Sequence, residues 1–120
     1  MADAASAGFA GLEAVKLIER TENSAALEFI IPGMSPYFDG HFPGFPILPA
    51  VAQAEIILRL AAEHLGTNIG ISEIKRIKFI KNIRPDILHL LWLEKNGRNL
   101  FFRISSCDNK IIFSSGTFIL

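Results

Sequence analysis

Cysteine, long apolar runs and metal-ligand spacings are all scarce in this sequence, and each absence excludes a class of protein. Cys107 is the only cysteine, which excludes an internal disulfide framework and a cysteine-rich zinc site. No apolar run approaches the roughly 18 residues that cross a bilayer, so we expect no membrane span. The first residues form neither a basic cluster nor an apolar segment, which predicts no secretory signal and a cytoplasmic location. No two of the three histidines have ligand spacing, so we expect no metal.

Net charge is absent as well, because 12 basic residues balance 12 acidic ones. A nucleic-acid-binding domain of this size is usually clearly basic, so we predict no nucleic-acid partner. The sum conceals an asymmetry: residues 1–72 hold three basic and eight acidic residues, a balance of −5, and residues 73–120 hold nine and four, a balance of +5. The basic charge is therefore concentrated in the C-terminal part.

What the chain does have is a large apolar share in a short length. Its 120 residues are 50% apolar, which predicts one globular domain over residues 1–120, with 1–12 as a flexible segment. A domain of this size has much surface for its volume, so we infer that apolar surface is buried against another chain. A homodimer, or a higher oligomer of dimers, is the simplest such assembly.

Hydrophobic periodicity and turn residues predict six strands and one helix. Pro49 suits the first turn of a helix and Gly66 suits its end, so we predict a helix over 49–65 with Val51 and Leu58 on its apolar stripe. The helix is apolar over much of its circumference, which indicates an antiparallel sheet curled around it, of α+β class. The predicted strands span residues 15–21, 25–31, 71–83, 87–93, 100–105 and 111–120.

The candidate chemistry lies where a stiff loop meets the helix. Five of the six prolines fall within residues 32–49, and an ordered loop of this length usually has a function. His41 lies there among aromatic residues, prolines and glycines, which suits a general base near neutral pH. Glu55, at the margin of the apolar stripe, could act as an acid. The backbone N–H groups of Ala50 and Val51 could stabilise an oxyanion, so the set suits removal of a proton beside a carbonyl with loss of a leaving group.

These groups also have simpler interpretations. Glu55, Arg59 and Glu63 are spaced i, i+4, i+8, as in an exposed ladder of ion pairs on a helix. A single histidine in a loop, such as His41, is often a structural hydrogen-bonding residue. His89, in an apolar strand, fits a core histidine with satisfied hydrogen bonds.

The segment from His41 to Glu55 resembles the signature of the β-hydroxyacyl-acyl-carrier-protein dehydratases of the hot-dog fold. That signature reads His-Phe-Pro-Gly-x-Pro, then Ile or Val, Met or Leu, and Pro-Gly-Val, with an acidic residue fourteen positions after the histidine. A later stretch, residues 78–86, resembles the family's strand after the helix, and residues 115–118 are similar to its ending. The matching positions of the first segment are His41, Phe42, Pro43, Gly44, Pro46, Ile47, Leu48, Pro49, Val51 and Glu55.

The resemblance implies a dimer with two sites at its interface, in which His41 of one chain faces Glu55 of the other. His41 would remove the C2 proton of a β-hydroxyacyl thioester, and Glu55 would protonate the C3 hydroxyl, which leaves as water. The N–H of Ala50 would stabilise the thioester oxygen, and no cofactor would be needed. The substrate would arrive on an acyl carrier protein and enter an apolar tunnel, for which the expected substrate-binding residues are Phe42, Gly44, Pro46, Ile47 and Val51.

The chain departs from the family pattern at three positions near the site, Ala50, Arg59 and Glu55. Ala50 stands where the signature has glycine, and its methyl group could crowd the thioester. Arg59 stands where members of fatty-acid synthesis carry glutamine four residues after the acid, whereas Gln53 lies before it. This arrangement looks closer to the aryl-polyene type of dehydratase. Glu55, rather than aspartate, resembles the dehydratases that do not also isomerise the double bond.

A basic run follows the helix and alternates with apolar residues. One interpretation is a solvated strand face. The other is a docking patch for the acidic carrier protein, whose electrostatic attraction would weaken with salt. The residues of this predicted patch are Lys75, Arg76, Lys78, Lys81 and Arg84.

Two other functions fit the same fold. A hot-dog acyl thioesterase would use a helix carboxylate to activate water and would release free thiol. A non-catalytic subunit would bind acyl chains or complete a heterodimer, with Arg59 pairing to Glu55 and disabling it.

Overall fold

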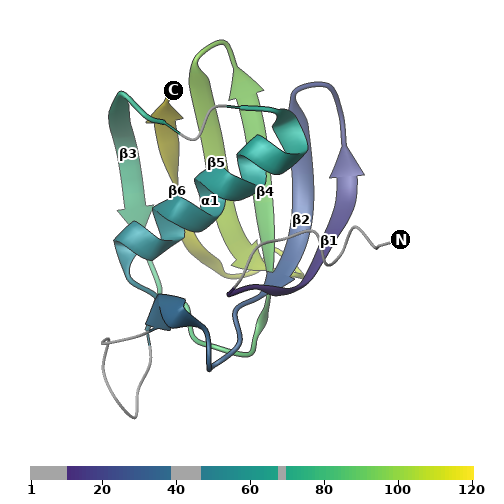
Figure 1. Ribbon diagram of the computed structural model, residues 1–120, viewed down its shortest axis with the longest axis vertical. Helices are drawn as coiled ribbons and strands as arrows, with labels where there is room; N and C mark the ends of the chain where they lie inside the picture. Colours follow the sequence, from purple (N-terminus) through teal and green to yellow (C-terminus); the bar gives the residue numbers. More distant parts are fainter. Residues whose placement is uncertain (1–10, 39–46, 68–69) are drawn as a thin grey trace.

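A six-stranded antiparallel sheet curves behind a single long helix, which lies across one of its faces (Figure 1). The computed structural model describes residues 11–38, 47–67 and 70–120. The sheet order is β1-β2-β4-β5-β6-β3, so β1 and β3 are the two edges, and the architecture confirms the predicted α+β class. The strands are β1 Glu13–Arg20, β2 Ser24–Ile30, β3 Glu73–Phe79, β4 Leu88–Asn96, β5 Asn99–Ser106 and β6 Ile112–Ile119.

The helix α1, Ala50–Leu65, begins one residue after the predicted start and ends where the sequence predicts. Pro49 is its N-cap, with φ −74° and ψ 160°, and Gly66 ends it at φ 69°, where its N–H donates to the Ala62 carbonyl at 3.1 Å. No helix in the described ranges has the length and apolarity to cross a membrane.

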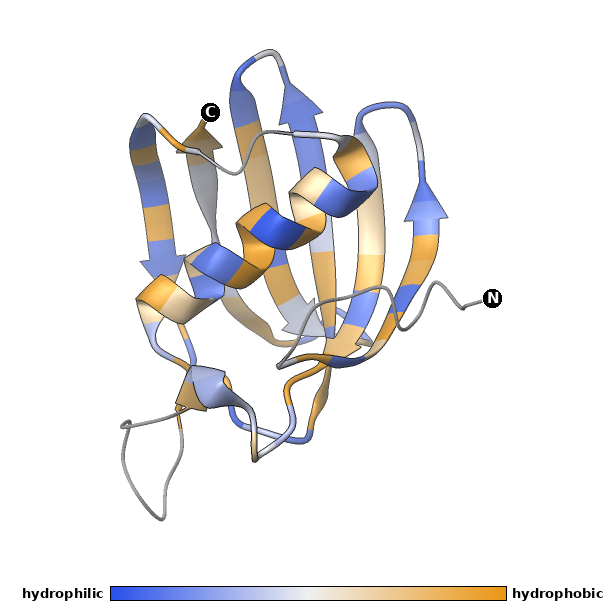
Figure 2. Cartoon of the chain, viewed as in Figure 1, coloured by the Kyte–Doolittle hydropathy of each residue, from blue (hydrophilic) through white to orange (hydrophobic). Residues whose placement is uncertain are grey.

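The buried face of α1 differs from the predicted apolar stripe. Val51, placed on that stripe, is 77% exposed, whereas Ile56 and Leu60, expected on the other side of the helix, are 1% and 0% exposed. Apolar and polar residues alternate in bands along the helix in Figure 2. The buried residues are Ala52, Gln53, Ile56, Ile57, Leu58, Leu60, Ala61 and Leu65.

The inner strands pair as their alternation predicts. Leu27, Phe29 and Ile31 are fully buried on the helix side of β2 and just beyond it. The two-residue turn Gly97-Arg98 joins β4 to β5, one residue later than predicted, because Asn96 still pairs with Asn99; Gly97 adopts φ 61°. These strands form the floor on which the helix packs.

The strand predicted over 71–83 is wrong in its length, because β3 ends at Phe79. Its pairing with β6 is interrupted by a bulge between Lys75 and Lys78, where Arg76 has φ 55°. Beyond Phe79 the N–H groups of Ile80 and Lys81 both donate to the Phe113 carbonyl, at 2.8 and 3.1 Å. Two donors on one acceptor end the ladder, and the chain then leaves the sheet.

His89 is buried, as predicted, but its ring nitrogens are not satisfied. The ring stacks on Phe29 with 5.6 Å between centroids and meets the Phe113 ring edge-on at 4.9 Å. It is 0% exposed, and neither Nδ1 nor Nε2 forms a hydrogen bond with a described residue. Burial lowers the pKa of His89 to about 4, because the charged ring cannot be solvated there.

The low pKa of His89 makes stability depend on pH. The unfolded chain binds a proton at His89 below its ordinary pKa of 6.5, whereas the folded chain does so only near 4. Stability is therefore fully present above about pH 6.5 and falls as the pH drops toward 4, by about 2 kcal/mol between pH 7 and pH 5. Urea unfolding at the two pH values measures this loss of unfolding free energy. For His89→Leu the loss between pH 7 and pH 5 should be about 2 kcal/mol smaller than for the wild type. Equal losses in both proteins would contradict the prediction.

Candidate active site

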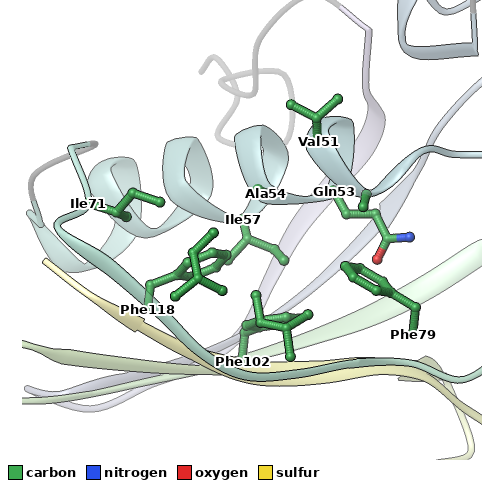
Figure 3. A pocket seen from close by; sticks show the side chains of 11 residues that line it. Val51, Gln53, Ala54, Ile57, Ile71, Phe79, Phe102 and Phe118 are labelled. Atoms are coloured by element: carbon green, nitrogen blue, oxygen red, sulfur yellow. The ribbon is translucent and has the colours of Figure 1, made fainter.

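An apolar cavity of about 370 Å³ lies between the first half of α1 and the strands β3, β5 and β6 (Figure 3). Of the described residues that line it, Gln53 alone has a polar side chain. A cavity of this size and character suits an acyl chain better than a polar substrate. Its lining residues are Ala50, Val51, Gln53, Ala54, Ile57, Ile71, Ile74, Ile77, Phe79, Phe102 and Phe118.

Gln53 places an amide at the boundary between this cavity and a second hollow of about 300 Å³. Its Nε2 donates to the Leu48 carbonyl at 3.4 Å, whereas Oε1 is buried and has no hydrogen-bond partner among the described residues. Figure 3 shows the amide extending from the helix toward Phe79, which also lines both spaces. The sequence pattern indicates Gln53 only as a feature of one branch of the family, and its position in the cavity wall is new.

The start of α1 lies at the same boundary. Ala50 is its first residue and lines both spaces. The first N–H groups of a helix have no partner within it, and the first helical bond here runs from Gln53 N to the Pro49 carbonyl at 3.0 Å. Val51 lines the cavity, and Ile47 lies half-buried just before the helix. The predicted oxyanion site and the apolar cavity therefore meet at Ala50.

Glu55 lies one turn beyond Val51 and keeps two polar contacts. The Tyr37 hydroxyl donates to its Oε2 at 3.0 Å, and Arg59 Nε lies 3.4 Å from the same oxygen. The side chains of Glu55 and Arg59 are both 51% exposed, so the predicted i, i+4 ion pair is present. Burial and the hydrogen bond to Glu55 raise the pKa of Tyr37 to about 12, so the phenol stays neutral at ordinary pH.

His41, Phe42, Gly44 and Pro46 lie outside the described residues, so their predicted roles remain predictions. The chain on either side is anchored in the core: Phe38 and Leu48 are 5% and 3% exposed. Leu48 N donates to the Ile83 carbonyl at 2.9 Å, which ties the entry to the helix to the chain after β3. Among the described residues, no three His, Cys, Asp or Glu side chains are grouped so as to hold a metal ion.

The five predicted docking residues lie in different surroundings. Lys75 and Arg76 line an open hollow of about 200 Å³ with Asn99, Phe101 and Thr117. Lys81 lines the hollow beside Gln53. Lys78 is exposed, and Arg84 is half-buried. Because β3 ends at Phe79, Lys81 and Arg84 lie beyond the strand. The interpretation of all five residues as one solvated strand face is therefore wrong. The docking role itself stays a prediction.

Comparison with known families decides which proteins this site belongs with. The model of the ApeI-like family, described as ApeI dehydratase, matches residues 17–117, which is most of the chain. The chain belongs to the ApeI-like dehydratase family. The match includes α1, the segment before it and every strand except the first residues of β1 and the end of β6.

Solved structures agree with this family and with the hot-dog fold. The dehydratase heterocomplex ApeI:P from Xenorhabdus doucetiae contains a chain that is 25% identical, with a TM-score of 0.76, covering 87% of this chain and 92% of that one. An uncharacterized protein from Erwinia carotovora subsp. atroseptica is 28% identical, with a TM-score of 0.63 and 89% of each chain covered. The predicted fold, one helix packed on a curled antiparallel sheet, is confirmed.

Curated relatives carry a dehydratase name over part of their length. The 3-hydroxyacyl-acyl-carrier-protein dehydratase FabZ of Chloroflexus aggregans is 34% identical over 82 residues, which cover 61% of this chain and 57% of that protein. FabZ of Levilactobacillus brevis is 44% identical over 62 residues, covering 45% and 42%. The chain thus spans about half the length of these relatives.

The apolar cavity predicts how a substitution on α1 affects the binding of an apolar ligand. Ala54 lines the cavity, so Ala54→Leu should fill part of it and raise the Kd of an apolar dye such as anilinonaphthalene sulfonate about tenfold. Ala62, two turns further along the same helix, lies outside the lining, and Ala62→Leu is the matched control. Fluorescence titration measures both. Equal effects of the two substitutions would show that the dye binds elsewhere.

Proposed function

We propose that the protein dehydrates a 3-hydroxyacyl thioester, carried on acyl carrier protein, to the trans-2-enoyl thioester. The observation that carries this proposal is the position of Glu55. It follows His41 by fourteen residues and lies one helical turn beyond Val51, and Val51 lines the apolar cavity. Membership of a dehydratase family and the names of the FabZ relatives support the same reaction. We assign the reaction to the cytoplasm and to fatty acid or specialised polyene synthesis.

The elimination needs a base, an acid and a site for the thioester oxygen. The acyl chain lies in the apolar cavity, with its carbonyl oxygen at the N–H of Ala50. His41 takes the C2 proton, and the C2–H electron pair becomes the second bond between C2 and C3. Glu55 gives a proton to the C3 hydroxyl, the C3–O bond breaks, and water leaves. Protons and electrons balance, so no cofactor is needed.

A second copy of the chain would supply the other half of each site. Within the described sheet, the edge strand β3 has no partner on its outer side, and apolar side chains are exposed along it and on the nearby helix start. Their exposed fractions are 54% for Ile74, 51% for Phe79, 56% for Ile80 and 77% for Val51. Pairing two copies through β3 would bury this surface and bring His41 of one chain to Glu55 of the other.

The carrier protein is the expected partner at the entrance. Lys81 lies exposed in the hollow that adjoins the cavity at Gln53 and Ala50. An acidic carrier would be attracted there and to the neighbouring Lys78. Lys75 and Arg76, in their separate hollow, and the half-buried Arg84 are the other residues of the predicted patch.

One observation favours a second candidate, a mixed pair. The matched Xenorhabdus chain comes from a dehydratase heterocomplex, and Arg59 contacts Glu55 here. A chain weakened by this contact could need a different partner subunit. A thioesterase, which needs the helix carboxylate but not His41, is the remaining alternative.

Substitution of the proposed base and acid tests the reaction. His41→Ala and Glu55→Gln should each lower kcat about a thousandfold, because each removes one proton-transfer group. Mass spectrometry of the carrier-bound product, which loses one water, measures the turnover. Wild-type turnover retained by both variants would refute the dehydratase assignment.

The same assay separates the alternatives. Release of free carrier thiol, with His41→Ala as active as the wild type, would identify a thioesterase. Loss of water only after a second dehydratase-like chain is added would identify a heterodimer.

A charge reversal tests the docking region. Lys81→Glu should raise KM for the carrier-bound substrate several-fold at low salt, and less at high salt because ions screen the attraction. KM for a small thioester without the carrier should not change. Lys110→Glu makes the same change of charge in the turn between β5 and β6 and is the matched control. An equal rise in both variants would mean that only net charge matters.

A further inference from the structure

The hydroxyl of Tyr37 reaches the carboxylate of Glu55 from a separate part of the chain. Tyr37 lies in the short 3-10 helix η2, Pro36–Phe38, and Glu55 lies in the second turn of α1, 18 residues later. The 3.0 Å distance between Oη and Oε2 is an ordinary hydrogen bond, and only the phenol can donate to an ionised carboxylate. No spacing or motif in the sequence predicts this pair.

The backbone around Tyr37 fixes the direction of its ring. Tyr37 N donates to Ser35 Oγ at 3.2 Å, and Phe38 N donates to the Ser35 carbonyl at 3.1 Å. Gly11, with φ 103°, lies against the Cδ2–Cε2 edge of the ring, where a Cβ would come within 2.8 Å of Cε2. The ring therefore has little freedom to move, and its hydroxyl is held at Glu55.

Two donors meet a single oxygen of Glu55. Arg59 Nε approaches Oε2 at 3.4 Å from one turn further along the helix, and Tyr37 approaches the same atom from η2. Neither contact uses Oε1. A carboxyl held through one oxygen has a defined plane, and its other oxygen has a defined direction.

We propose that Tyr37 is a positioning residue, which holds Glu55 through Oε2 so that Oε1 is directed at the C3 hydroxyl of the substrate. This inference rests on the proposed function, because it gives Glu55 the role of the acid. The proton passes from Oε1 to the leaving hydroxyl, while Tyr37 keeps its own proton throughout.

Kinetics of Tyr37→Phe test the proposal, because this substitution removes only the hydroxyl. We expect kcat to fall about tenfold with KM within about twofold, since the loss is one of orientation and not of binding. Ser106→Ala is the matched control: its hydroxyl also bonds a carboxylate, Asp108 Oδ1 at 2.6 Å, but in the turn after β5. In a Glu55→Gln background, Tyr37→Phe should cause no further loss.

The outcomes separate this inference from the proposed function. An active wild type with an equally active Tyr37→Phe variant would overturn the positioning role alone. A Tyr37→Phe loss of the same size in the Glu55→Gln background would also overturn it, because the hydroxyl would then act elsewhere. A wild type that eliminates no water, alone or with a second chain, would refute the proposed function.

A spectroscopic measurement tests the contact without any activity. Tyr37 is the only tyrosine, so tyrosinate absorbance reports this side chain alone. The wild type should titrate at a pKa of about 12, and Glu55→Gln should lower that pKa because the carboxylate that opposes ionisation is gone. Circular dichroism at each pH ensures that the protein is folded. An unchanged titration in Glu55→Gln would overturn the proposed contact.

Discussion

The packing of α1 on only part of the sheet is the constraint on which the rest of the structure depends. Leu60 and Ala61 are fully buried, and the helix packs against the central strands β2 and β4. Toward β3 and β6 the first half of the helix stands away from the sheet, and the apolar cavity fills the gap. The same geometry places the open end of the helix at the cavity, because Pro49 fixes where α1 begins. The cavity, the free N–H groups at the helix start and the position of Glu55 near them thus all follow from one packing arrangement.

The polar groups at this end of the helix are few, and each is restrained. Gln53 is held by the Leu48 carbonyl, Leu48 is held by Ile83, and Glu55 is held between Tyr37 and Arg59. Polar groups that are oriented before a substrate arrives need no reorganisation during the reaction. The apolar surroundings also strengthen any interaction made within the cavity. A small domain can therefore hold a reactive site with very few polar residues.

Local signals in the sequence predicted the helix and the family correctly. Pro49 and Gly66 act within one turn of the helix, so its bounds follow from them, and the motif that runs from His41 to Glu55 indicates the family. The end of β3 was predicted wrongly, because it depends on hydrogen bonds across strands: the N–H groups of Ile80 and Lys81 share the Phe113 carbonyl. The burial of His89 was predicted but its unsatisfied nitrogens were not, since their partners would come from other strands. The Tyr37–Glu55 contact joins distant segments and corresponds to no pattern in the sequence.

Irregular edges on both sides of the sheet have a consequence for assembly. The register of β1 shifts twice along β2, and β3 carries the Arg76 bulge, whereas the inner ladder between β4 and β5 is regular. A regular edge can add strand after strand without limit, as in a fibre. A bulged edge accepts a neighbour only over a short stretch and in one register. Irregular edges on both sides therefore oppose unlimited growth of this sheet by further copies, although apolar side chains are exposed along β3.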